Sequence, residues 1–142
     1  MPNIEIITRA VILDKDKILL CKKKSADYYF LPGGHIEFGE TAQQALEREL
    51  KEELNIETDK IDYIGTIENM FSENGNRHHE INLVFAVKPQ NHSSISNEDH
   101  IDFFWTGINK LAGESVEPIA LKQAILQWLK DKKLFWGSEK EI

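Results

Sequence analysis

The chain has 142 residues, the length of one domain with a buried core, and we expect residues 1–142 to form a single domain. Its 41% hydrophobic and 29% charged residues are typical of a globular protein and exclude a disordered or collagen-like chain. The net charge of −7 argues against binding to a nucleic acid polymer through basic side chains, although a divalent cation can bring a small phosphate substrate to such a protein.

Membrane insertion and export are not indicated by the sequence. No stretch approaches the ~20 apolar residues of a membrane span, and the first residues lack the basic start and apolar run of a signal peptide. Cys21 is the single cysteine and cannot form an internal disulfide, so a reducing compartment is expected. We therefore expect a cytoplasmic protein without a membrane partner, as a monomer or a homodimer.

The first part of the chain predicts two strands and a helix. Residues 4–13 and 17–22 are rich in β-branched and aliphatic side chains and flank an Asp-Lys-Asp turn, which is typical of paired strands. A helix is expected over residues 41–55, with Thr41 as its N-cap and Gln44 completing a capping box.

The second part predicts three more strands and a final helix. Strands are expected over residues 62–71, 79–87 and 101–105, with loops at 72–76 and 91–99. After Pro118, apolar residues recur at helical spacing, which indicates a helix packed on the core; they are Leu121, Ala124, Ile125, Trp128 and Leu129. Strands separated by two helices indicate a layered α/β domain.

The chemistry is concentrated in the helix over residues 41–55. On a helical wheel, Glu49, Glu52 and Glu53 fall within an arc of about 100°, and Glu53 lies inside the apolar side of the helix. Like charges in a partly buried position repel one another and lose hydration, so a positive group should lie beside them. Arg48 can pair with Glu52, but one guanidinium cannot neutralise three carboxylates, whereas a divalent cation with oxygen ligands (Mg²⁺, Mn²⁺ or Ca²⁺) can do so.

Two simpler interpretations stay open at this point. A solvated acidic face would explain Glu47 and Lys51, which point away from the apolar side, but it does not explain Glu53. Gly33 and Gly34, just before the helix, are compatible with a plain turn. They would also let the backbone approach a ligand closely, and a main-chain carbonyl there would add an oxygen ligand.

These residues resemble the Nudix box, G-x5-E-x7-R-E-U-x-E-E-x-G-U, in which U is aliphatic. Eight of the nine defined positions match, namely Gly34, Glu40, Arg48, Glu49, Leu50, Glu52, Glu53 and Ile56. The departure is Asn55, where the family usually has glycine. Because asparagine tolerates the left-handed backbone conformation better than other non-glycine residues, we expect it to end the helix.

The resemblance implies a Nudix-like α/β/α sandwich with a mixed central sheet. It implies hydrolysis of a pyrophosphate bond in a nucleoside diphosphate linked to another group, with Mg²⁺ or Mn²⁺ as cofactor and a small nucleotide as partner. By motif position, Glu49, Glu52 and Glu53 would be metal ligands, and one of them would orient or deprotonate the attacking water.

The motif also implies supporting roles around the carboxylates. Gly33 would offer its carbonyl to the metal ion, and Gly34 would lie against the substrate. Arg48 would hold a carboxylate in place, and Glu40 would brace the loop against the helix. A catalytically weak nucleotide-binding or sensing module on the same fold is the alternative function.

Further candidate residues lie outside the box. The family often draws another acid from a later loop, for which Glu98 is the first candidate, although it is equally compatible with a solvated loop acid. Glu37, closer in sequence to the glycines, is the second candidate. On the strand at residues 79–87, Glu80 and Asn82 form an unusually polar face. We expect this face to line the substrate cavity, where Asn82 would reach a base edge or sugar; the alternative is a solvent-facing sheet surface.

Overall fold

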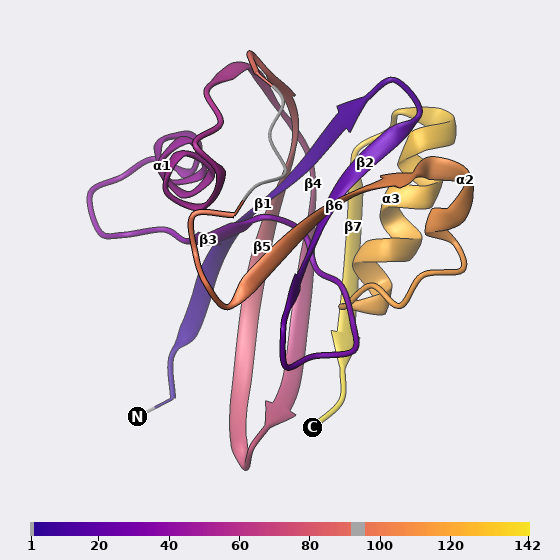
Figure 1. Cartoon of the computed structure of the whole chain (residues 1–142). Coiled ribbons are helices and arrows are strands. Elements are labelled where there is room, and N and C mark those ends of the chain that lie inside the picture. Colours follow the sequence, from indigo (N-terminus) through magenta and orange to yellow (C-terminus); the bar gives the residue numbers. More distant parts are fainter. Residues whose placement is uncertain (1, 92–95) are drawn as a thin grey trace.

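The computed structural model describes residues 2–91 and 96–142, so residues 92–95 of the polar loop expected at 91–99 lie outside the described part. Within that part, seven strands form one mixed sheet with helices on both faces (Figure 1). The strands are β1 (Ile4–Asp14), β2 (Lys17–Lys23), β3 (Gly33–His35), β4 (Thr58–Glu73), β5 (Asn76–Pro89), β6 (Ile101–Gly107) and β7 (Phe135–Lys140), and the helices are α1 (Ala42–Leu54), α2 (Ile108–Leu111) and α3 (Ile119–Asp131).

The sheet has the order β6-β2-β1-β5-β4-β7, and β3 pairs with β1 beside this path. The pairs β1–β5 and β4–β7 are parallel and the others are antiparallel, which confirms the expected mixed sheet. None of the helices in the described residues is long and apolar enough to cross a membrane.

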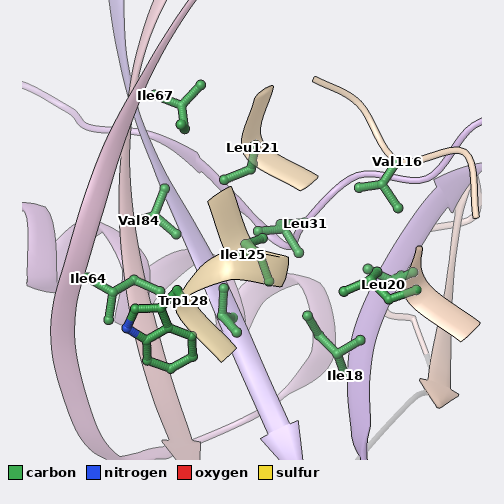
Figure 2. Packing of buried hydrophobic residues seen from close by; sticks show 12 residues of the cluster. Ile18, Leu20, Leu31, Ile64, Ile67, Val84, Val116, Leu121, Ile125 and Trp128 are labelled. Carbon is green, nitrogen blue, oxygen red and sulfur yellow. The ribbon is translucent and has the colours of Figure 1, made fainter. Parts of the chain in front are cut away.

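Alternating residues of the strands build one core on each face of the sheet. Ala10 and Ile12 of β1 face α1, whereas Val11 faces α3, as expected from the two-residue period of a strand. The core on the α3 face is shown in Figure 2 and consists of Val11, Ile18, Leu20, Leu31, Ile64, Ile67, Val84, Leu111, Val116, Leu121, Ile125 and Trp128. The predicted apolar stripe of the last helix is therefore part of the core.

The loop expected at residues 72–76 is wrong, because β4 and β5 continue to a two-residue connection. Asn74 and Gly75 have φ of 53° and 80°. An Asn-Gly pair with positive φ at both positions is typical of the tight turn whose twist matches that of a hairpin. The hairpin is consequently longer than its apolar pattern indicates.

Three elements were not expected from the sequence: β3, α2 and β7. In β3, Gly33 pairs with Arg9 of β1 at a φ of 144°, and a Cβ there would lie 1.9 Å from the Thr8 carbonyl oxygen. The segment is therefore a strand rather than a plain turn. β7 pairs in parallel with β4, and the paired residues are 70 positions apart in the chain, so the place of β7 in the sheet depends on non-local contacts.

Both ends of α1 are capped as expected. The Thr41 hydroxyl accepts a hydrogen bond from the Gln44 backbone N–H, and the Gln44 side chain accepts one from the Thr41 N–H, which confirms the capping box. At the other end, Asn55 has φ 55° and ψ 35°, and its N–H donates to the Lys51 carbonyl. The left-handed conformation predicted for Asn55 is thus confirmed.

Replacing Asn55 tests this conformation. Glycine adopts positive φ without strain, so Asn55→Gly should change the free energy of unfolding by less than about 1 kcal/mol. Asn55→Val should lose about 1–3 kcal/mol, because a β-branched residue is strained there. Urea unfolding of the three proteins measures both values, and equal losses in the two variants would show that the Asn55 amide makes a specific contact instead.

Candidate active site

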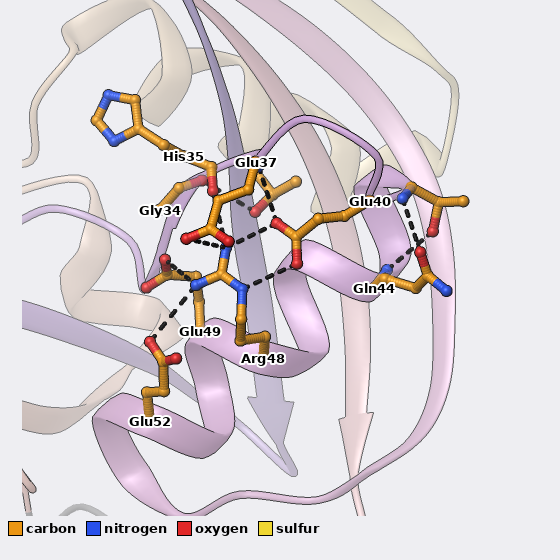
Figure 3. Close-up of polar contacts among 10 residues, drawn as sticks. Gly34, His35, Glu37, Glu40, Gln44, Arg48, Glu49 and Glu52 are labelled. Carbon is orange, nitrogen blue, oxygen red and sulfur yellow. Dashed lines mark hydrogen bonds and ion pairs between the residues drawn. The ribbon is translucent and has the colours of Figure 1, made fainter.

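Arg48 of α1 is the centre of a group of ion pairs with acidic residues before the helix and within it (Figure 3). Its Nε and Nη2 donate to both oxygens of Glu40 at 2.9 and 2.7 Å, and its Nη1 donates to Glu49 at 2.9 Å. Nη2 also donates to the His35 carbonyl at 3.1 Å, which ties β3 to the helix. The planar guanidinium thus fixes the loop before α1 and the Glu49 carboxylate together.

The same guanidinium sets the charge of its partners. Hydrogen bonds from Arg48 and from the Glu37 backbone lower the pKa of Glu40 to about 2. Glu52 is more loosely held, since its carboxylate lies 3.5 Å from Arg48 Nη1 and its side chain is 57% exposed. Glu52 can therefore reorient, whereas Glu40 and Glu49 are held in place.

Gly34 leaves the space in which the Glu49 carboxylate lies. A Cβ on Gly34 would lie 2.4 Å from the Glu49 Cδ, so any other residue would displace this carboxylate. The Gly34 carbonyl accepts a hydrogen bond from the Thr8 hydroxyl at 3.2 Å, which fixes β3 on β1. The absence of a side chain at Gly34 thus brings backbone and carboxylate oxygens side by side.

Glu53 is the buried carboxylate of the site. It is 5% exposed, in agreement with its position on the apolar side of α1. Burial raises the pKa of Glu53 to about 8, with further contributions from the charge of Glu49, a hydrogen bond to Glu49 and the charge of Glu98, while Arg9 opposes the shift. Glu49 and Glu53 are therefore neighbouring carboxyl groups on this side of the helix, and Glu49 is paired with Arg48.

Glu98 is brought to the site by the segment after the β5 strand. The Asn97 backbone N–H donates to the Glu53 carbonyl at 2.8 Å and the Asn97 side chain donates to the Glu52 carbonyl at 3.1 Å. These bonds cap the end of α1 and hold Glu98 near Glu53, and the His100 Nε2 lies 3.4 Å from the Glu98 carboxylate. Asn97 was missed by the sequence reasoning, because only the folded chain brings it to the helix end.

The remaining predicted residues lie at different depths. Glu37 is 70% exposed and lies 3.9 Å from Arg48, at the edge of the ion-pair network. Asn82 is 1% exposed, donates to the Ile67 carbonyl at 3.3 Å and accepts from Arg9 at 3.4 Å. Glu80 lines a cavity of about 660 Å³ on the α3 face of the sheet, whereas the buried Asn82 is not among the residues that line this cavity.

Arg9 connects this cavity to the carboxylates of α1. Its side chain lines the cavity and donates to the Leu31 carbonyl at 3.0 Å, and its charge opposes the burial that raises the pKa of both Glu53 and Glu80. Sequence reasoning missed Arg9. The signal was a single basic residue in the middle of an otherwise apolar strand, Ile6-Ile7-Thr8-Arg9-Ala10-Val11-Ile12.

The donor set fits a hard divalent cation. The side-chain donors are carboxylate oxygens, and Glu49 and Glu53 lie within hydrogen-bonding distance of each other, where only a proton or a cation relieves their repulsion. Within the described residues, no group of three acidic, His or Cys side chains is already arranged to hold a metal ion. Since Glu52 is exposed, its rotation from Arg48 toward Glu53 would complete such a group.

A mixed sheet between helices, with a Glu-rich helix placed after a Gly-Gly strand, defines the class to which this chain belongs. Residues 5–129 match the model of the NUDIX domain family. The chain therefore belongs to the NUDIX domain family.

Solved structures and one curated relative agree with this assignment. A MutT protein from Bacillus halodurans superposes with a TM-score of 0.80 at 19% identity, over 94% of this chain and 88% of that chain. A NUDIX hydrolase from Nitrosomonas europaea superposes with a TM-score of 0.78 at 17% identity, over 99% and 81% of the two chains. At such identities the likeness shows the fold alone.

The curated relative is more similar in sequence but matches over a shorter stretch. It is an ADP-ribose pyrophosphatase from Methanocaldococcus jannaschii, 39% identical over 82 residues, which cover 54% of this chain and 46% of that protein. The chain thus spans about half the length of this relative.

Replacing Glu53 by glutamine tests the cost of its buried charge. In the folded protein this carboxyl keeps its proton up to about pH 8, whereas in the unfolded chain it loses the proton near its ordinary pKa of 4.5. The folded state therefore binds the extra proton, and its stability falls as the pH rises through this window. With metal chelated, Glu53→Gln should match the parent at pH 5 and exceed its melting temperature by at least about 2 °C at pH 8.5.

Glu47→Gln, on the exposed side of the same helix, is the control and should behave as the parent at both pH values. Loss of stability in Glu53→Gln at both pH values would instead indicate a structural ion pair.

Proposed function

We propose that this protein hydrolyses a pyrophosphate bond in a nucleoside diphosphate linked to another group, with Mg²⁺ or Mn²⁺ as cofactor. The observation that carries the proposal is the buried Glu53 carboxyl, which lies beside Glu49. The pKa of Glu53 is raised to about 8 in the absence of a cation. Burying like charges is unfavourable unless a positive ligand joins them, and phosphate substrates arrive with such ions. The matched curated relative is itself named a pyrophosphatase of a nucleoside diphosphate derivative.

The proposed metal ligands are Glu49, Glu52, Glu53 and the Gly33 carbonyl. A bound Mg²⁺ would neutralise charge on the phosphates and increase the acidity of water at the site. The all-oxygen donor set supports this cofactor rather than zinc. One sheet carries all the strands of the described residues, which supports the proposal of a single domain over residues 1–142.

The chain's own groups orient the water and accept its proton. Water attacks one phosphorus of the pyrophosphate, the bond from that phosphorus to the bridging oxygen breaks, and the leaving phosphate keeps the electron pair. We assign the acceptance of the water's proton to Glu52 or Glu49, whose carboxylates lie on the same side of α1. Glu98 adds a further acid next to Glu53.

Arg48 and Glu40 are positioning residues in this proposal. Arg48 holds Glu49 at 2.9 Å and is itself fixed by both oxygens of Glu40, so the Glu49 carboxylate keeps one orientation. The geometry of this fork is specific to arginine, because lysine offers no planar pair of donors. Glu37 and Gly34 line the approach to the same carboxylates, where substrate phosphates would lie.

Activity of charge-removing variants tests the function. Hydrolysis of a panel that includes nucleoside triphosphates, ADP-ribose and nucleotide sugars should require Mg²⁺ or Mn²⁺ and stop with chelator. Glu53→Gln keeps the shape of the side chain but removes its charge, and should lower the rate by at least about 10²-fold. Glu47→Gln, on the exposed side of α1, should keep the parent rate.

Parent activity in Glu53→Gln would contradict its assigned role. Nucleotide binding without any turnover across the panel would favour the sensing module instead of the enzyme.

A further inference from the structure

Asn69 of β4 carries the one buried side-chain oxygen that lacks a hydrogen-bond partner in the described residues. The side chain is 7% exposed, and its Oδ1 is the unpaired atom. A buried polar atom without a partner costs free energy, so such an atom is usually found where a ligand or water completes its bonding. Asn69 lines the 660 Å³ cavity on the α3 face, and because Oδ1 itself has almost no accessible surface, the amide group must rotate for a ligand in the cavity to reach this oxygen.

The neighbours of Asn69 in the sheet are two carboxylates. Glu80 of β5 lies directly opposite Asn69 in the antiparallel pair, and Glu139 of β7 is its partner in the parallel pair. Side chains of directly paired residues lie on one face about 5 Å apart. All three line the cavity, so they form a row of hydrogen-bond acceptors across β5, β4 and β7.

Part of this row is already held by the protein. The Glu139 carboxylate accepts a hydrogen bond from the Ala120 N–H at 2.8 Å and so fixes the start of α3. Burial raises the pKa of Glu80, and the charge of Arg9 opposes this shift. Asn69 Oδ1 is left as the acceptor with unused capacity, with Glu80 on the side nearer Arg9.

The charges around the cavity determine how a nucleotide can lie in it. Its lining carries six acidic residues, Asp27, Glu73, Glu80, Glu117, Glu139 and Glu141, but only two basic ones, Arg9 and Lys23. Phosphates are repelled by this wall and are placed best near Arg9, whose charge also acts on Glu53 of α1. The opposite end therefore suits the part of the substrate that has hydrogen-bond donors and no negative charge.

An aromatic ring completes the cavity. Phe71, two residues after Asn69 on the same face of β4, lines it and is stacked on His78 with ring centroids 4.9 Å apart and 14° between the planes. Planar rings held in this way are suitable surfaces for stacking a base. A flat ring with amino groups fits beside Phe71 and against the acceptor row.

We propose that the cavity binds the nucleobase of the substrate through an exocyclic amino group, which donates to Asn69 Oδ1 and Glu80. This inference rests on the proposed function, because it places the phosphates at the α1 carboxylates. It makes Asn69 a specificity-determining residue and predicts a preference for adenine, guanine or cytosine over hypoxanthine and uracil, which lack the amino group. A site built to bond a donor rejects a ligand without it, because its buried acceptor is left unpaired.

Binding of matched nucleotides tests the proposal independently of turnover. With Mg²⁺ present, the dissociation constants of ADP, GDP, CDP, IDP and UDP, which lack the further linked group of the proposed substrates, are measured by NMR titration of the whole chain. IDP is the amino-free purine reference and UDP the amino-free pyrimidine reference. At least one amino-bearing nucleotide should bind at least about fivefold more tightly than its reference, the factor expected for one net hydrogen bond.

Two variants show whether Asn69 is responsible. Asn69→Leu keeps the size of the side chain and removes its oxygen, and should reduce that ratio below about fivefold without weakening the amino-free reference. Asn76→Leu, the same change at an exposed position on the hairpin, should keep the parent ratio. Thermal unfolding of both variants shows that they are folded.

A ratio below fivefold for every pair in the parent, no binding of any nucleotide, or a ratio unchanged in folded Asn69→Leu would overturn the proposal. The proposed function is judged separately by metal-dependent hydrolysis. Turnover without base discrimination would contradict only the proposed role of Asn69. Base discrimination without turnover would contradict only the proposed hydrolase activity.

Discussion

The structure depends on keeping several carboxylates together on one side of a helix that also packs on the core. Arg48 relieves part of this repulsion through its paired hydrogen bonds to Glu40 and its bond to Glu49. It cannot reach the buried Glu53, whose pKa is consequently raised to about 8. The backbone beside the helix also accommodates these carboxylates, because Gly34 has no side chain and leaves room for the Glu49 carboxylate. Packing, charge and backbone conformation thus meet at the site that we propose binds a cation.

Local features were predictable from the sequence because they depend on residues three or four positions apart. The capping box at Thr41, the left-handed Asn55 and the buried position of Glu53 all follow from the repeat of one helix. The hairpin length was underestimated because polar residues continue both strands up to Asn74 and Gly75. In that segment the turn type, rather than hydrophobic alternation, determines where the strands end.

Features that depend on distant pairing could not be predicted in the same way. Arg9 lies in an apolar strand, and its relation to Glu53 and Glu80 exists only after the sheet has formed around it. Asn97 reaches the end of α1 from 45 residues away. The acceptor row at Asn69 requires β5 and β7 to pair with β4 in one particular register. A one-residue shift would turn the side chain of Asn69 to the other face.

β7 also affects how this protein meets other copies of itself. Without it, the 16-residue strand β4 would lie at the border of the sheet with a long row of unpaired backbone groups, which is a template for aggregation. β7 pairs with Gly65 to Met70 of that strand and thereby becomes the edge strand of the sheet. It has six residues, which include two charged ones, Glu139 and Lys140. A short, charged strand is a poor surface for further strand addition. The last strand of the chain therefore limits edge-to-edge association as well as forming one wall of the cavity.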